Sequence, residues 1–277
     1  MSHITLIDLC KNNQDITPEM IRGLKDEIGK QNNIGYTALM LLCKYNKKIT
    51  PELIRELKDE IGMKDKDGNT ALMLLCEYDI KITLEMIQAL EIEVGEKNKD
   101  RKTALMSLCE NNPNITPELI RLFKDEIRMK DKDGKTSLMY LCIYNRSINL
   151  KLVKELKDGI KMKDRWENTA LMFLCECNKN ITPELIRELK DEIGMRCRDG
   201  GTALMYLCRC NRKITSELIK ELKDEIGCQD KDGNTALLYL YKRNKKNITK
   251  ELIMNLKNEI NIYNIDEIIN FYCEKYN

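Results

Sequence analysis

Cysteine is the residue type with the clearest chemical potential in this chain, because a thiolate can bind a metal ion and two thiols can form a disulfide. The chain has 12 cysteines, and seven of them recur at a fixed interval of 33 residues. These are Cys10, Cys43, Cys76, Cys109, Cys142, Cys175 and Cys208. Such an interval spreads side chains along successive helices about 8–10 Å apart, whereas a disulfide needs Cα atoms within roughly 7 Å. The spacing therefore predicts reduced core residues.

Two closer cysteine pairs are the remaining candidates for a thiolate site. Cys177 follows Cys175, and Cys210 follows Cys208, each at a spacing of two residues. Residues two apart on a helix point to different faces, so neither pair brings two sulfur atoms to one metal ion. We therefore predict no metal site and no cofactor.

Residues suited to other kinds of catalysis are scarce. The chain has one histidine, His3, and no Gly-rich phosphate loop that ends in Gly-Lys-Ser/Thr. A histidine-based triad needs an imidazole held beside a nucleophile and an acid. Neighbouring carboxylates such as Asp59 and Glu60 fall on the expected outer face of a helix, where we predict solvated charge. The sequence therefore predicts that the chain is not an enzyme.

The elements that must carry these residues repeat along the chain. A threonine recurs every 33 residues, and the cysteine of the series follows it six residues later. The threonines are Thr37, Thr70, Thr103, Thr136, Thr169, Thr202 and Thr235. A constant period in this range indicates a solenoid, in which each repeat buries its apolar face against its neighbours.

The repeated block resembles the ankyrin repeat. Residues 65–70 read Asp-Lys-Asp-Gly-Asn-Thr, similar to the family's Asp-x-x-Gly-x-Thr turn. Thr-Ala-Leu-Met-x-Leu-Cys then stands where the family has Thr-Pro-Leu-His-x-Ala-Ala. The resemblance implies an all-α, ankyrin-type helix-turn-helix solenoid with short hairpin tips. Its predicted units are residues 1–29, 30–62, 63–95, 96–128, 129–161, 162–194, 195–227 and 228–260, followed by a capping segment at 261–277.

Each unit is predicted to contain two helices. Helix one starts at the threonine, and its apolar residues recur at helical spacing. An asparagine three residues after the cysteine, as at Asn46, is expected to end helix one in the left-handed conformation. Helix two opens with Thr-Pro-Glu, as at Thr50, because threonine caps a helix and proline fits its first turn. The predicted solvated face of helix two holds Arg55, Glu56, Lys58, Asp59 and Glu60.

Composition limits the kinds of partner. With 47 basic and 45 acidic residues, the formal charge of +2 gives no overall field that would favour nucleic acid. The lysines and arginines of the predicted hairpins are nearly cancelled by interleaved aspartates. No apolar run reaches about 18 residues, and residues 1–30 lack a signal-peptide pattern, so we predict no membrane insertion. The chain is expected to be a cytoplasmic monomer in a reducing compartment.

The resemblance implies that partners bind the hairpin tips and the concave face of helix one. Positions four, seven and eight after the threonine vary among the repeats, and positions four and eight share one helical face. That face and the hairpin carrying the single tryptophan hold most of the aromatic residues. The predicted partner-binding residues are Tyr45, Tyr78, Tyr140, Tyr144, Trp166, Phe173, Tyr206 and Tyr239. Clustered exposed aromatics are common anchors of protein interfaces, although such residues also serve to cover the core between repeats.

The predicted function is a non-catalytic protein-protein interaction module with a protein partner, whose main contact surface lies in repeats five to seven. Two alternatives are an architectural spacer without a dedicated partner and a regulatory or targeting subunit of a separate enzyme. Unit 96–128 is predicted to be the weakest of the stack, because Arg101 replaces the turn glycine at a cost of roughly 1–2 kcal/mol. Ser107 and Asn111 also interrupt the aromatic column there.

Overall fold

The computed structural model describes residues 4–78 and 81–262. The described chain divides into two compact units, Met1–Ser137 and Leu138–Asn277, here called unit one and unit two, and each is described by itself. Of the predicted capping segment, residues 263–277 lie outside the described residues. Both units are all-α, and the part of the chain that the structure describes contains no β-strand.

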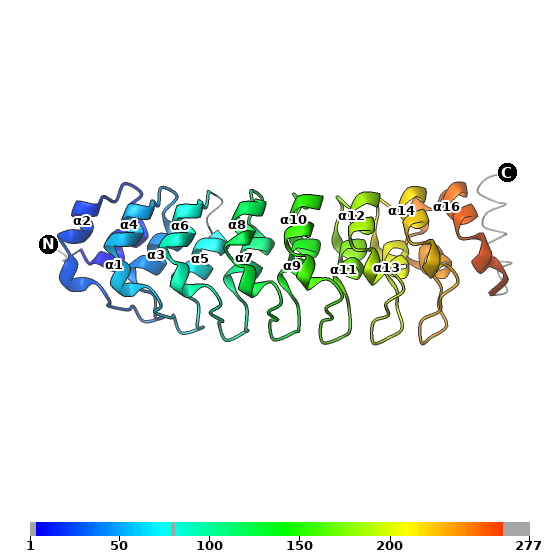
Figure 1. The fold of residues 1–277 in the computed structure, drawn as a ribbon, viewed down its shortest axis with the longest axis horizontal. Helices are drawn as coiled ribbons and strands as arrows, with labels where there is room; N and C mark the ends of the chain where they lie inside the picture. The colour runs from blue at the N-terminus through cyan, green and yellow to red at the C-terminus, as the bar shows by residue number, and fades with distance from the viewer. Residues whose placement is uncertain (1–3, 79–80, 263–277) are drawn as a thin grey trace. The chain divides into compact units, whose positions relative to one another are not determined.

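Unit one contains paired helices separated by hairpin tips (Figure 1). The first helices of its repeats are α1 (Leu6–Asn12), α3 (Ala38–Tyr45), α5 (Ala71–Tyr78) and α7 (Ala104–Asn111). The second helices are α2 (Pro18–Arg22), α4 (Pro51–Glu56), α6 (Leu84–Ala89) and α8 (Pro117–Arg121). A 3-10 turn follows each second helix: η1 (Lys25–Glu27), η2 (Lys58–Glu60), η3 (Glu91–Glu93) and η4 (Lys124–Glu126).

Unit two repeats the same order of elements. Its first helices are α9 (Ser137–Tyr144), which starts one residue before the unit, α11 (Ala170–Cys177), α13 (Ala203–Cys210) and α15 (Ala236–Arg243). Its second helices are α10 (Leu150–Glu155), α12 (Pro183–Glu188), α14 (Ser216–Glu221) and α16 (Lys250–Asn255). The 3-10 turns are η5 (Lys157–Gly159), η6 (Lys190–Glu192), η7 (Lys223–Glu225), η8 (Lys245–Asn247) and η9 (Lys257–Ile262). Within each unit the first helices form one layer and the second helices another, and the hairpin tips project on the side of the first helices (Figure 1).

The first helices begin where the repeated threonine predicts. In α3 the hydroxyl of Thr37 accepts a hydrogen bond from the backbone N–H of Met40 at 3.3 Å, which satisfies one of the free donors at the helix start. All seven cysteines of the 33-residue series are buried in these helices. By contrast, Cys177 and Cys210 are exposed, which confirms that the close pairs divide between two faces.

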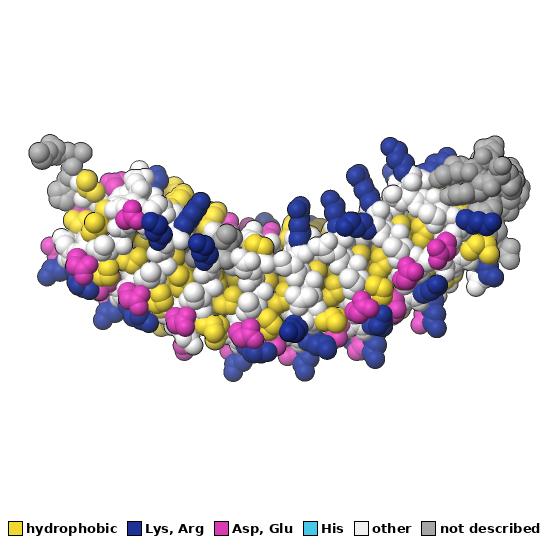
Figure 2. Space-filling view, turned by 90° about the horizontal axis from the view of Figure 1, so that it is seen from above, with side chains coloured by type: hydrophobic (Ala, Val, Ile, Leu, Met, Phe, Trp, Pro, Cys, Tyr) yellow, Lys and Arg dark blue, Asp and Glu magenta, His cyan; other side chains and the backbone are white. Residues whose placement is uncertain are grey.

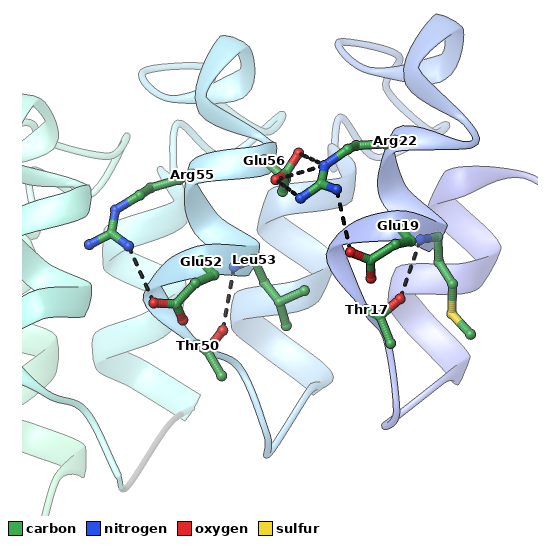
Figure 3. Close-up of polar contacts among 9 residues, drawn as sticks. Thr17, Glu19, Arg22, Thr50, Glu52, Leu53, Arg55 and Glu56 are labelled. Atoms are coloured by element: carbon green, nitrogen blue, oxygen red, sulfur yellow. Dashed lines mark hydrogen bonds and ion pairs between the residues drawn. The ribbon is translucent and has the colours of Figure 1, made fainter.

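The second helices also begin as predicted but end earlier. Thr50 caps α4 by accepting from the N–H of Leu53, and Pro51 occupies the first helical position (Figure 3). Helix α4 ends at Glu56, which accepts from Arg22 of the preceding repeat at 2.8 Å. The following turn η2 is a 3-10 helix and brings its last residue back toward the core.

That last residue is a buried glutamate, which corrects the prediction that Glu60 is solvated. Glu60 is 1% exposed, and its Oε1 accepts from the backbone N–H of Gly29 at 2.9 Å. Its Oε2 accepts from the N–H of Leu39, so one carboxylate joins its own first helix to the preceding repeat. The same two bonds recur within the units, and we call the residues that make both bonds the clamp glutamates. They are Glu60, Glu93, Glu126, Glu192, Glu225 and Glu259.

The asparagines that end first helices do so differently from the prediction. Asn46 has φ −88° and ψ 111°, so it is extended rather than left-handed. Its Oδ1 accepts from the N–H of Lys48, and its Nδ2 donates to the carbonyl of Asn13 one repeat earlier. In unit two, Asn211 donates in the same way to the carbonyl of Asn178 at 3.2 Å. We call these residues the ladder asparagines, because they form a ladder of hydrogen bonds along the loops between the helices. Asparagine therefore occurs at this position because of its side-chain hydrogen bonds and not because of its backbone angles.

The hairpin tips are braced by a carboxylate and joined by backbone bonds. Asp65 accepts from the N–H groups of Asp67 at 2.9 Å and Asn69 at 2.8 Å, which closes the turn. The N–H of Lys99 donates to the carbonyl of Asp67, so successive tips of unit one are connected directly. The turn requires a positive φ, which glycine normally supplies, and Arg101 adopts φ 60° there as the sequence predicted.

Candidate functional site

The predicted aromatic residues divide into exposed and buried members. Tyr45 and Tyr78 of unit one are 39% and 46% exposed, and Tyr144 of unit two is 49% exposed. Tyr140 is half-buried and stacks on Tyr144 with ring centroids 5.9 Å apart. Phe173 is only 9% exposed, so it belongs to the core and the prediction that it is an exposed anchor is wrong.

A hollow in unit two lies between the hairpin tips and the first helices of its last two complete repeats. It has a volume of about 250 Å³ and is walled by Tyr206 of α13 and Tyr239 of α15. The guanidinium of Arg209 lies 4.6 Å from the ring centre of Tyr206 and 5.6 Å from that of Tyr239. Its Nη2 is 3.2 Å from Glu176, which fixes the cation between the rings.

The hydroxyl groups of this hollow are already bonded. Tyr206 Oη donates to Asn168 Oδ1 at 2.9 Å, and Tyr239 Oη donates to Asp230 Oδ2 at 2.5 Å. Burial, and after it the neighbouring Asp230 carboxylate, raises the pKa of Tyr239 to about 12. Burial also raises the pKa of Tyr206, so both rings carry neutral hydroxyl groups at pH 7. The two tyrosine hydroxyls are therefore unsuited to proton transfer, while Asp199, Asp230 and Asp232 add carboxylates to the lining of the hollow.

A hollow of unit one shows the same combination of tyrosine and cation. It has a volume of about 330 Å³ and is lined by Tyr45, Tyr78 and Lys44. Lys44 Nζ lies 4.8 Å from the ring centre of Tyr78 and donates to Tyr36 Oη at 2.9 Å. Both hollows therefore place a cation among tyrosines.

Trp166 stands at a hairpin tip of unit two, as predicted. Its side chain is 38% exposed, and the guanidinium of Arg165 covers one ring face at 4.1 Å. Its backbone N–H donates to Asp164 Oδ1 at 2.9 Å, and its carbonyl accepts from Arg198 at 2.8 Å. Glu167 takes the turn glycine's place with φ 66°. The backbone of the tip is thus fixed while part of the indole remains open to a partner.

The sequence reasoning missed Lys44 and Arg209, although it recognised their position as variable. Both residues directly follow a cysteine of the 33-residue series, Cys43 and Cys208. For Arg209 the signal is Tyr206 one turn earlier on the same helical face. For Lys44 the rings belong to Tyr36, Tyr45 and Tyr78, and the local spacing gives no such signal.

The described residues contain no group of three or more His, Cys, Asp or Glu side chains arranged to hold a metal ion. Burial raises the pKa of the Cys109 thiol, and burial with nearby carboxylates does the same for Cys208. These thiols are therefore protonated, whereas nucleophilic and metal-binding cysteines are thiolates. In the described part of the chain, no helix has the length and apolar character needed to cross a membrane.

The sequence matches no family model, and no curated protein sequence matches it. Its structure is similar to the crystal structure of the ankyrin repeat domain of Bcl-3, a member of the IkappaB protein family, with a TM-score of 0.54 and 17% sequence identity. That match covers 80% of this chain and 99% of the Bcl-3 chain. A chain in the complex of the Bd0816 predatory endopeptidase from Bdellovibrio bacteriovorus with the immunity protein Bd3460 matches with a TM-score of 0.45 and 21% identity, covering 63% of this chain and 92% of that one. The chain therefore has the ankyrin repeat fold, in a divergent form with Thr-Ala-Leu-Met-x-Leu-Cys in place of Thr-Pro-Leu-His-x-Ala-Ala.

Proposed function

We propose that the chain is a non-catalytic protein-protein interaction module, which binds a protein partner through its first-helix face and hairpin tips. The observation that carries this proposal is the hollow walled by Tyr206, Arg209 and Tyr239. The hydroxyls of Tyr206 and Tyr239 are satisfied within the chain, and both rings line the hollow, where a side chain of a partner could pack against them. Trp166 supplies a partly exposed aromatic side chain on a neighbouring tip.

The physical reason for a partner is the apolar surface that these rings leave exposed. Covering such surface contributes roughly 25 cal/mol per Å², and tyrosine, tryptophan and arginine dominate the energetics of measured interfaces. The backbone that carries them is fixed by bonds between successive tips, such as Lys231 N to Asp199 O at 2.9 Å, so little ordering is needed on binding. The exposed thiols of Cys177 and Cys210 support a reducing, cytoplasmic setting for the same module.

The test compares partner capture by wild-type chain and by Trp166→Ala and Tyr144→Ala variants, with quantitative mass spectrometry of the retained proteins. A partner of this face should be retained by the wild type and weakened about tenfold or more by Trp166→Ala. The matched control is Ile92→Ala, because Ile92 is an apolar side chain 78% exposed on a 3-10 turn away from the proposed face. If only the control lost the partner, the proposed face would be wrong. If the wild type retained no protein, an architectural spacer would be the better interpretation.

A further inference from the structure

Several charged side chains of unit two are paired locally. On the second-helix side, Arg187 pairs with Glu184 at 3.0 Å and with Glu221 at 3.1 Å. At the hairpin tips, Lys163 pairs with Glu167 at 3.2 Å. Near the ends of the first helices, the carboxylate of Glu176 is engaged by Arg209.

A set of exposed basic residues lies in the loops that join the first and second helices. Each loop of unit two has a basic residue directly after the ladder asparagine, and the loops after Asn211 and Asn244 have a second basic residue next to it. We call the basic residues of the first three loops, Arg146, Lys179, Arg212 and Lys213, the basic row. All four are exposed, and within the described part of the chain none of them forms an ion pair. In the C-terminal half of Figure 2, Lys and Arg side chains project from one edge with few acidic neighbours, while basic and acidic side chains alternate on the opposite edge.

The asparagine ladder holds this row in register. Asn178 Nδ2 donates to the carbonyl of Asn145 at 3.1 Å, and Asn211 Nδ2 donates to that of Asn178 at 3.2 Å. Arg146, Lys179 and Arg212 follow these asparagines immediately, and the N–H of Lys213 donates to Asn211 Oδ1 at 2.9 Å, so the backbone of the row is held by the ladder. Successive repeats stack about 10 Å apart, which sets the spacing of the cations along the row.

The row also borders a cavity with no acidic lining. The cavity has a volume of about 390 Å³ and is lined by Arg146, Lys179 and Lys213 together with Tyr144 and Cys177. Three cations with no carboxylate among them repel one another, so an anion placed there gains attraction from all three. Tyr144 adds an apolar wall, since it is 49% exposed.

We propose that the basic row of unit two binds an extended acidic segment of a partner protein, with a carboxylate at about every third residue. An extended polyproline-type segment rises about 3.1 Å per residue with three residues per turn, so every third side chain recurs after about 9 Å on one side. That interval matches the repeat spacing, and arginine and lysine in the row can each meet one carboxylate. Nucleic acid fits less well, because one strand carries a phosphate about every 3.4 Å and the chain's net charge is only +2. This inference names a partner class for the proposed interaction function and rests on it, but it uses different residues from Trp166.

The test is the fluorescence anisotropy of a labelled peptide of about twelve residues with Glu at every third position, long enough for four repeats. Measurements are made at about 0.1 M salt, where the Debye length is about 10 Å, with the Gln version of the peptide and an oligothymidylate of equal net charge as competitors. We expect the acidic peptide to bind and the Gln peptide to fail. The variant Arg146→Gln, Lys179→Gln, Lys213→Gln should weaken binding about tenfold, because three exposed ion pairs of modest strength are lost.

The matched control changes three exposed lysines of α14 and of the 3-10 turns η6 and η7, and so removes the same charge outside the basic row. The three changes are Lys190→Gln, Lys220→Gln and Lys223→Gln. Equal weakening by both triple variants, or tighter binding of the oligothymidylate, would overturn the inference. The single variant Lys179→Gln should give about a threefold loss and guards against misfolding of the triple variant. Ile92→Ala should leave peptide binding unchanged, because Ile92 lies on a 3-10 turn of unit one. Failure of the peptide to bind would overturn this inference alone, since the proposed function is tested through Trp166.

Discussion

Replacing one clamp glutamate should destabilise the fold far more than replacing a nearby surface glutamate. Glu225 is 1% exposed, and its Oε1 and Oε2 accept from the N–H groups of Gly194 and Leu204, each at 2.7 Å. In Glu225→Gln only one oxygen remains, so one buried N–H faces the new amide nitrogen instead of an acceptor. A buried donor left without a partner costs about 1–3 kcal/mol. In Glu225→Ala both donors lose their acceptor, and the expected loss doubles to about 2–6 kcal/mol.

The matched control is Glu221→Gln, which removes the same charge four residues earlier. Glu221 pairs with Arg187 at 3.1 Å on a partly exposed surface, where such a pair contributes about 0–1 kcal/mol. Urea denaturation followed by circular dichroism gives the free energy of unfolding, and amide hydrogen exchange at Leu204 reports the local opening that a repeat protein can undergo. The reasoning would be refuted if Glu225→Gln and Glu221→Gln lost equal stability, or if Glu225→Ala were milder than Glu225→Gln.

Three further measurements follow from the same structure. Burial raises the pKa of the clamp glutamates above the ordinary value of 4.5, so the folded chain holds their protons more tightly than the unfolded chain. The free energy of unfolding should therefore rise as the pH falls from 7 toward 4.5. A steady decline of that free energy over this window would contradict the raised pKa values. A thiol reagent should modify exposed Cys177 and Cys210 rapidly and buried Cys175 only as the chain opens, as mass spectrometry of the labelled peptides would show. Arg101→Gly should stabilise the fold by about 0.5–1 kcal/mol, because relief of the positive φ exceeds the entropy cost of glycine; urea denaturation showing a loss would count against that balance.

The starts of the helices and the hairpin turns could be predicted from the sequence because they depend on single residues and their near neighbours in the chain. The threonine caps, the proline at the first position of helix two and the positive φ at Arg101 each follow from one residue and its neighbours. The role of Glu60 could not be read this way. Its sequence neighbours are charged, and only the 3-10 turn after α4 directs it toward N–H groups 21 and 31 residues earlier.

The sequence predicted the location of the candidate site better than it predicted which of its side chains are exposed. Exposed Tyr144 and Trp166 follow from their positions on a helical face and a hairpin tip. Phe173 has the same position as Tyr206 in its repeat, yet it is buried, whereas Tyr206 is half-buried with its hydroxyl bonded to Asn168. Phenylalanine has no hydroxyl group that needs a hydrogen-bond partner, so its ring can be buried entirely in the core. Side-chain chemistry at one repeat position therefore decides whether the ring joins the surface.

The division between repeating and varying positions explains how this fold can carry a binding surface at little cost to stability. The clamp glutamates and ladder asparagines satisfy backbone groups inside the stack, so a change at those positions leaves buried donors unpaired. Tyr144, Trp166 and the basic row lie at exposed positions, where the residue type can differ from repeat to repeat. The fifth repeat marks the limit of this arrangement, because Gly159 occupies the clamp position and has no carboxylate. Repeat 96–128, by contrast, has Glu126 bonded to Gly95 and Leu105 at 2.8 Å. Repeat 129–161 therefore lacks the carboxylate that joins the repeats elsewhere, whereas repeat 96–128 keeps its clamp and carries the unfavourable φ of Arg101.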